Sequence, residues 1–211
     1  SIDSGGEASD VRDFDDRVRR ELAAADWDGE IEYFCEPKFD GLSIEVRYDE
    51  GRYERAATRG DGEAGDDVTE QVRTIGALPL QLRGDYPESL ALRGEVYMPR
   101  EAFQAYNRER IEAGEEPFAN PRNAAAGTIR QLDPDVVAER PLSVYFFEVL
   151  EASREFDSLS AIYEALPSWG LRVTDRTELV EDIEGAIEYR DALLETRDEV
   201  DVEIDGAVIT I

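Results

Sequence analysis

The spacing of apolar residues divides the chain into helices and strands. Apolar positions recur at helical spacing over 11–25, which predicts an amphipathic helix. Apolar and polar residues alternate over 42–48, which predicts a half-buried strand, and Asp49-Glu50-Gly51 then turns the chain into a second strand at 53–58. Further strands are predicted at 31–36, 90–98, 142–150, 171–174 and 202–211, and further helices at 100–113, 123–131, 159–166 and 183–195.

Strands in this order are expected to pair locally and antiparallel, with helices between some of them, so the predicted fold class is α+β. The segment 59–66 is too rich in glycine for regular structure and is predicted to be a loop. We see no repeat and no inner boundary, and residues 1–211 are expected to form one domain. Because the chain starts at Ser1 and stops inside an apolar strand, we expect a fragment of a longer protein.

The chain is strongly acidic, with 51 acidic against 23 basic residues and a formal net charge of −28. Such a charge normally argues against a nucleic-acid partner, because phosphate binding needs a basic footprint. With 41% hydrophobic residues the chain can nevertheless fold, and this composition resembles that of halophiles with molar salt in the cytoplasm. The Debye length there falls to about 3 Å, so the net charge indicates a high-salt environment more than it indicates the kind of ligand.

The cysteine and histidine content excludes several kinds of site. The lone cysteine, Cys35, excludes an internal disulfide, fits a reducing cytoplasm, and is predicted to be buried in a strand. The absence of histidine excludes Ser-His and Cys-His catalysis and the usual zinc sites. No apolar run reaches the roughly 18 residues of a membrane span. We therefore expect a cytoplasmic protein with no membrane partner, and a monomer.

A single lysine, Lys38, stands among the 23 basic residues, within Glu36-Pro37-Lys38-Phe39-Asp40-Gly41. A neutral lysine amine is a nucleophile, whereas arginine stays charged. Glu36, Lys38 and Asp40 share one side of an extended backbone, and the two carboxylates favour the charged amine. Nucleophilic chemistry then requires a bound cation, a substrate phosphate, or proton transfer to Asp40. The alternative is a solvated strand face with one ion pair. Gly41 argues against this alternative, because glycine in a strand often permits a ligand to approach closely.

Two further patterns suit phosphate binding. Thr58-Arg59-Gly60-Asp61-Gly62 could fold backbone amides around a phosphate, with guanidinium donors from Arg59, although glycine-rich turns are common. Arg122 and Arg130 lie about two turns apart on a helix that Pro121 opens and that small residues then continue. This pair fits the binding of two phosphates, or ordinary solvation of a helix.

Two residues on predicted strands suit a nucleoside. The carboxylate of Glu95 could accept a ribose hydroxyl or hold a metal, whereas a simple edge-strand charge is the alternative. The ring of Phe147 could stack on a base, although core packing is the commoner fate of such a residue.

Four ordered segments resemble the adenylation domain of bacterial-type NAD-dependent DNA ligases. Residues 36–41 resemble the lysine motif that these enzymes share with ATP-dependent ligases and capping enzymes. Residues 57–62, 92–96 and, above all, the long block 118–133 resemble the NAD branch in particular. The resemblance covers nearly the whole chain and implies the nucleotidyltransferase fold, with antiparallel sheets flanked by helices.

The resemblance also implies a reaction. Lys38, assisted by Asp40, would attack the α-phosphate of NAD, release nicotinamide mononucleotide (NMN) and hold AMP as a phosphoramidate. The AMP would then pass to the 5′-phosphate of nicked double-stranded DNA, and the 3′-hydroxyl would displace it and seal the strand, as replication and repair require. Such a transfer gains mostly from positioning and from neutralising charge on oxygens.

The resemblance assigns roles to matching residues. Those expected to contact NAD are Ser1, Ile2, Glu36, Lys38, Arg59, Glu95 and Phe147. Among them, Glu36 and Phe147 would contact adenine, while Arg59 and Glu95 would contact the ribose and phosphate. Those expected at phosphate and the nicked strand are Arg122 and Arg130, and those expected near Mg²⁺ are Glu95 and Asp205.

Two departures from the family pattern affect these expectations. Thr210 stands where the family usually places a lysine that contacts the nucleotide phosphate. The N-terminal subdomain that binds NMN is missing, as are the oligonucleotide-binding fold, zinc finger, helix-hairpin-helix and BRCT parts. We therefore expect zinc only outside this chain, and poor self-adenylation of the fragment alone.

Two other functions stay open. An ATP-dependent ligase or capping-type nucleotidyltransferase would share the lysine motif but not the block 118–133. An inactive ligase-like module that binds nicked DNA is the third possibility, and Thr210 motivates it.

Overall fold

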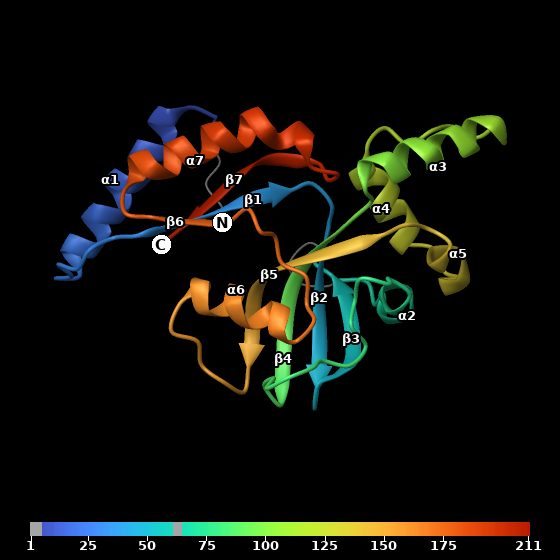
Figure 1. The fold of residues 1–211 in the computed structure, drawn as a ribbon, viewed down its shortest axis with the longest axis horizontal. Helices are drawn as coiled ribbons and strands as arrows, with labels where there is room; N and C mark the ends of the chain where they lie inside the picture. The colour runs from blue at the N-terminus through green and yellow to red at the C-terminus, as the bar shows by residue number, and fades with distance from the viewer. Residues whose placement is uncertain (1–5, 61–64) are drawn as a thin grey trace. The chain divides into compact units, whose positions relative to one another are not determined.

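The computed structural model describes residues 6–60 and 65–211 (Figure 1). The strands are β1 (Tyr33–Phe39), β2 (Leu42–Asp49), β3 (Arg52–Thr58), β4 (Ser89–Tyr97), β5 (Ser143–Ala152), β6 (Glu178–Val180) and β7 (Ile204–Thr210). The helices are α1 (Ala8–Ala24), α2 (Thr69–Arg73), α3 (Arg100–Glu112), α4 (Pro121–Ile129), α5 (Pro134–Ala138), α6 (Leu159–Ser168) and α7 (Ile183–Thr196), followed by a 3₁₀ turn at Arg197–Glu199. In the described part of the chain, no helix is both long and apolar enough to cross a membrane.

The packing divides the chain into two compact units, each built from separate segments. The first unit comprises Ser1–Lys38, Arg176–Arg197 and Gly206–Ile211. The second unit comprises Phe39–Asp175 and Asp198–Asp205. The α+β class predicted from the sequence is confirmed, because both units combine helices with sheets whose pairs β1–β6, β2–β3, β2–β4 and β4–β5 are antiparallel.

The first unit contains a small sheet with the strand order β6-β1-β7, together with α1 and α7. Its core consists of buried residues from α1, α7 and the segment that leads through β1, namely Val18, Ile31, Tyr33, Cys35, Ile183 and Ala186. Cys35 is fully buried, as predicted, and burial raises the pKa of its thiol to about 12. Its thiol therefore stays protonated and packs as a small apolar group.

A buried polar group also joins α1 to β1. The hydroxyl of the fully buried Tyr33 donates a hydrogen bond to the Asp15 carboxylate, which accepts a second one from Arg19 Nε at 2.9 Å. Burial and the Asp15 contact raise the pKa of Tyr33 to about 12. Since the unfolded tyrosine titrates near pH 10, this contribution to stability is complete below pH 10 and is lost as the pH rises towards 12.

We expect Tyr33→Phe to lower the free energy of unfolding by about 1.5–3 kcal/mol, because the buried Asp15 carboxylate loses a donor. Urea unfolding in molar salt at pH 8 measures this, and the deficit should shrink above pH 10. The matched control is Tyr106→Phe, since Tyr106 makes its contacts to Arg110, Arg140 and Phe118 through its ring. Equal losses in the two variants would contradict the assignment.

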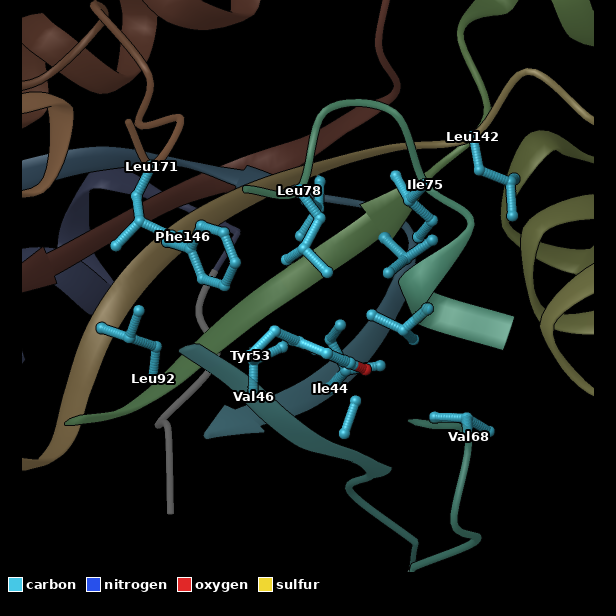
Figure 2. Packing of buried hydrophobic residues seen from close by; sticks show 14 of the residues in the cluster. Ile44, Val46, Tyr53, Val68, Ile75, Leu78, Leu92, Leu142, Phe146 and Leu171 are labelled. Carbon is cyan, nitrogen blue, oxygen red and sulfur yellow. The ribbon is translucent and has the colours of Figure 1, made fainter. Parts of the chain in front are cut away.

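The second unit is built on a sheet with the order β3-β2-β4-β5. One face of this sheet carries the main core, where Val46, Leu92 and Phe146 are almost fully buried (Figure 2). Ala124 and Ala125 of α4 belong to the same core with no exposed surface. The alternation over 42–48 therefore predicted the buried face of β2 correctly.

The opposite face of this sheet is polar. It carries Ser43, Glu45 and Arg47 of β2 beside Arg93 and Glu95 of β4, by the register of the two strands. Ion pairs lie on this face: Arg47 Nε lies 2.6 Å from Glu45 of the same strand, and Arg93 Nη1 lies 2.5 Å from Glu148 of β5. The charged groups along this part of the face make it suited to a polar ligand.

Three sequence predictions need correction or extension. The predicted strand at 171–174 is wrong, because this segment is irregular: Leu171 packs into the core, and the Arg172 carbonyl accepts a hydrogen bond from Phe146 N at 2.8 Å. The short strand lies instead at β6. Helices α2 and α5 were not predicted, since five residues are too few to show a helical period. β1 also runs on past 36 and contains Lys38.

Candidate active site

Lys38 lies in β1, one residue before the strand ends, and its side chain is partly buried. Glu36 precedes it by two residues and is also partly buried. Both belong to the first unit, whereas Phe39, Asp40 and Gly41 belong to the second. Because side chains alternate along a strand, Glu36 and Lys38 leave one side of β1 and Phe39 leaves the other.

The three residues after Lys38 are held by several parts of the second unit. Asp40 N donates to the carbonyl of Glu203 at 2.9 Å, and Gly41 N donates to Glu95 Oε1 at 3.2 Å. The Asp40 carboxylate accepts a hydrogen bond from Arg122 Nη1 at 2.9 Å. The structure therefore brings together Asp40, Glu95 and Arg122, which the sequence assigned from three separate motifs.

The Asp40–Arg122 ion pair is more useful for orientation than for stability. The Arg122 side chain is 58% exposed and that of Asp40 is 23% exposed. A pair this accessible to water contributes at most about 1 kcal/mol. Arg122 can therefore exchange Asp40 for a phosphate oxygen at little cost in free energy, and its planar guanidinium suits that ligand.

Gly41 is required by the protein's own packing. A Cβ at this position would lie well inside 3.0 Å of the Val96 carbonyl oxygen of β4, a separation that real Cβ atoms essentially never show. The expectation that Gly41 permits the approach of a ligand needs revision, because the close neighbour is backbone. By allowing that approach, the glycine brings its own N–H to Glu95.

Phe147 lies at a bulge in β5. Phe146 pairs with Gly94 and Glu148 pairs with Arg93, so Phe147 has no partner residue in β4. Phe146 is 1% exposed and packs in the core, whereas Phe147 is only half-buried. Phe147 is therefore not a core residue of the kind that Phe146 is. Bulges of this kind redirect a side chain, often beside functional sites.

Arg59 is exposed at the start of the glycine-rich loop. Its backbone N–H donates to the Ser43 carbonyl of β2 at 3.2 Å. The base of the loop is closed by Thr58, whose N–H and Oγ1 both bond to the backbone of Asp66 at 2.9 Å. Residues 61–64 lie outside the described residues, as do Ser1 and Ile2, which were expected to contact the cofactor.

Arg122 and Arg130 lie at opposite ends of α4. Asn120 caps the helix by accepting a hydrogen bond from Asn123 N at 2.7 Å, and Pro121 occupies the first turn. Small residues let this helix pack closely: a Cβ at Gly127 would lie 3.0 Å from the ring of Phe118. Arg130 is exposed and lies about 12 Å from Arg122 along the helix axis. Arg122 is the member of this pair whose contact with Asp40 the structure shows.

The metal expectation rests on the chemistry of two carboxylates. Asp205 is exposed near the start of β7, and Glu95 lies on the polar face of the sheet. Within residues 6–60 and 65–211, no group of three or more histidine, cysteine or acidic side chains is arranged to hold a metal ion. Carboxylate oxygens nevertheless fit Mg²⁺, which keeps several waters and needs only one or two carboxylates when it binds with phosphates.

Sequence reasoning missed the aromatic residues beside this site. The ring of Tyr145, the cross-strand neighbour of Glu95, stacks on Phe39 at 4.7 Å and on Tyr97 at 5.1 Å. The signal was present in the aromatic run at 145–147, but periodicity alone does not show which ring faces the core.

Comparisons with known proteins agree with the resemblance seen in the sequence. The family model of the NAD-dependent DNA ligase adenylation domain matches residues 1–211. The DNA ligase of Haloarcula marismortui is 64% identical over 211 residues, covering 100% of this chain and 30% of that protein. The DNA ligase of Salinibacter ruber is 45% identical over 210 residues, covering 97% of this chain and 30% of that protein. The chain thus spans about a third of the length of these relatives, and their halophilic sources agree with its acidic composition.

A solved structure shares the fold. Mycobacterial DNA ligase D complexed with ATP and MES is 15% identical, with a TM-score of 0.51, over 85% of this chain and 48% of that one. At this identity the likeness concerns the fold alone, and it confirms the predicted ligase-type nucleotidyltransferase architecture. With a family model that matches every residue, the chain belongs to the NAD-dependent DNA ligase adenylation domain family.

Proposed function

We propose that this chain is the catalytic core of an NAD-dependent DNA ligase and that Lys38 is its nucleophile. The observation that carries the proposal is the anchoring of the residues next to Lys38. Asp40 contacts Arg122 and Gly41 contacts Glu95, so three of the motifs assigned from the sequence meet beside the only lysine. A solvated strand face would not require this convergence.

In the first step, the lone pair of Lys38 Nζ attacks the α-phosphorus of NAD. A phosphorus–nitrogen bond forms, the bond between that phosphorus and the bridging oxygen breaks, and NMN leaves with the bonding electrons. The amine proton passes to Asp40 or to solvent. Arg122 assists by moving from Asp40 to a phosphate oxygen, which is feasible because the pair is exposed.

The nucleoside contacts follow the family pattern. Glu36 and Phe147 contact adenine, Glu95 and Arg59 contact the ribose and phosphate, and Ser1 and Ile2 complete the cofactor contacts. The position of Phe147 at a bulge and of Glu95 on the polar face supports these roles. Glu95 and Asp205 would hold Mg²⁺, whose chemistry is to neutralise charge on the phosphate oxygens.

In later steps the AMP passes to the 5′-phosphate of nicked DNA and the strand is sealed, with Arg122 and Arg130 at the phosphates. A net charge of −28 does not forbid a DNA partner in molar salt, because the Debye length is then only about 3 Å. We further propose a cytoplasmic monomer whose zinc-binding and other DNA-binding parts lie outside residues 1–211.

Mass spectrometry of the complete protein in molar salt tests the first step. We expect incubation with NAD and Mg²⁺ to add one AMP, and incubation with ATP to add none. Within this chain, the labelled peptide must contain Lys38, since there is no other lysine. Labelling by ATP alone would favour the ATP-dependent ligase, and binding of NAD without labelling would favour the inactive module.

A further inference from the structure

Three aromatic rings form a row on the polar face of the large sheet, beginning at the residue after Lys38. Phe39 and Tyr145 stack with ring centroids 4.7 Å apart and planes inclined by 15°. Tyr145 and Tyr97 stack at 5.1 Å with planes inclined by 7°. Tyr145 is therefore the ring that both stacks share, and we call Phe39, Tyr145 and Tyr97 the aromatic row.

The row is fixed at the end away from Lys38. Tyr97 is only 5% exposed, and burial raises the pKa of its phenol to about 12, so this end is a neutral buried ring. The guanidinium of Arg172 lies 5.1 Å from the Tyr145 ring centroid, and its Nη1 donates to Ser143 Oγ at 2.9 Å. Tyr145 thus has contacts from two strands and from the segment after α6, which restrict its rotation.

Fixing the Phe39 ring has a consequence for Lys38 through the covalent chain. Adjacent side chains leave opposite sides of an extended strand. If the Phe39 ring cannot turn, the backbone at this point cannot rotate about the strand axis, and the direction in which the Lys38 side chain leaves the backbone is set. The hydrogen bonds of Asp40 N and Gly41 N fix the backbone beyond Phe39, whereas the row acts on the side chain that opposes Lys38.

We propose that Tyr145 is a positioning residue for adenylation: through Phe39, it holds the strand in the rotation that aims the Lys38 amine. The inference rests on the proposed role of Lys38 as the nucleophile. Tyr145 itself contacts no reacting atom in this scheme. A purely structural role would instead lower stability and leave the rate of the folded enzyme unchanged, so rate and stability must be measured separately.

The test uses the complete protein in molar salt, with single-turnover formation of the AMP adduct at saturating NAD and Mg²⁺. A misplacement of about 1 Å costs about 100-fold in rate, and we expect Tyr145→Leu to lower the rate by about 10- to 100-fold. The dissociation constant for NAD should change by less than about threefold, since no cofactor contact is removed. Tyr145→Phe keeps the stacked ring and should retain the rate to within about threefold.

Phe39→Leu provides a second route to the same result, because Phe39 is partly exposed and tolerates truncation. It should slow adenylation as much as Tyr145→Leu does. The double variant should be no slower than either single variant, because both changes break one contact. The matched control is Phe156→Leu, which removes a ring from an aromatic pair with Trp169 at the main core and should not change the rate.

The outcomes separate the inference from the proposed function. Losses that multiply in the double variant, or a Tyr145→Leu enzyme that is folded and fast, overturn the positioning role and leave Lys38 as nucleophile. A wild-type protein that binds NAD but is never adenylated overturns both. Thermal unfolding of each variant shows which rates come from folded protein. If Tyr145→Leu does not fold, the positioning role is tested by the rates of Phe39→Leu, expected to be slow, and Tyr145→Phe, expected to be retained.

Discussion

Lys38→Arg is expected to abolish adenylation while the protein stays folded. The guanidinium keeps the positive charge but does not lose a proton at any accessible pH, so it offers no lone pair to phosphorus. Loss of a nucleophile of this kind lowers a rate by at least about 10⁴-fold. Intact-mass measurement after incubation with NAD should show no added AMP, and nick sealing should fall to the background.

A second lysine elsewhere provides the matched control. Arg12 lies on α1 in an exposed ion pair with Glu184 at 2.7 Å, and Arg12→Lys keeps its charge. This variant should be adenylated at the wild-type rate and on Lys38 alone, because the introduced side chain would be an ordinary solvated amine. Adduct on the new lysine, or sealing by Lys38→Arg, would show that the site does not select Lys38.

Gly41→Ala is expected to have the second largest effect. The new methyl group would overlap the Val96 carbonyl oxygen, and Val96 is held in β4 by pairing with Leu42, the residue after Gly41. Overpacking of this kind costs about 1–3 kcal/mol, and we expect the upper end of that range. Adenylation should also slow by at least about tenfold, because the displaced N–H loses its hydrogen bond to Glu95 beside the nucleophile.

Gly76→Ala is the control for this change. A Cβ at Gly76 would meet no atom within 4 Å, and its backbone does not have the positive φ that disfavours other residues. We expect it to be neutral, or stabilising by up to about 1 kcal/mol through the unfolded state. Chemical denaturation in molar salt compares the two variants. If Gly41→Ala were as harmless as Gly76→Ala, the close approach to β4 would not determine the site.

Much of the local structure could be read from residue spacing. The helix at α1 and the strand pair β2–β3 follow from local periods and a turn, and each lies within three residues of its predicted bounds. The prediction at 171–174 was wrong because an apolar residue in an irregular segment, Leu171, packs like a strand residue. No composition shift marks the two compact units, because each is assembled from segments that alternate along the chain.

For the site residues, the chemical types could be predicted but the contacts could not. Their chemical types and their motifs in the sequence were enough to point to Lys38, Asp40, Glu95 and Arg122. Their contacts were not predictable, because Asp40 and Arg122 are 82 residues apart and Gly41 and Glu95 are 54 apart. Tyr145 pairs with Glu95 of β4, whereas Phe147 has no partner because β5 bulges between Phe146 and Glu148. Such a shift in strand register cannot be read from a single sequence.

The sequence by itself determined the local elements, the family and the identity of the one possible lysine nucleophile, because these depend on short periods and on residue chemistry. Only the tertiary structure decided that Gly41 packs against the backbone of β4, that Phe146 and not Phe147 lies in the core, and that Tyr145 stacks on Phe39, the residue after Lys38. Those decisions depend on strand register and on packing between distant segments, which are properties of the whole fold and not of any window of residues.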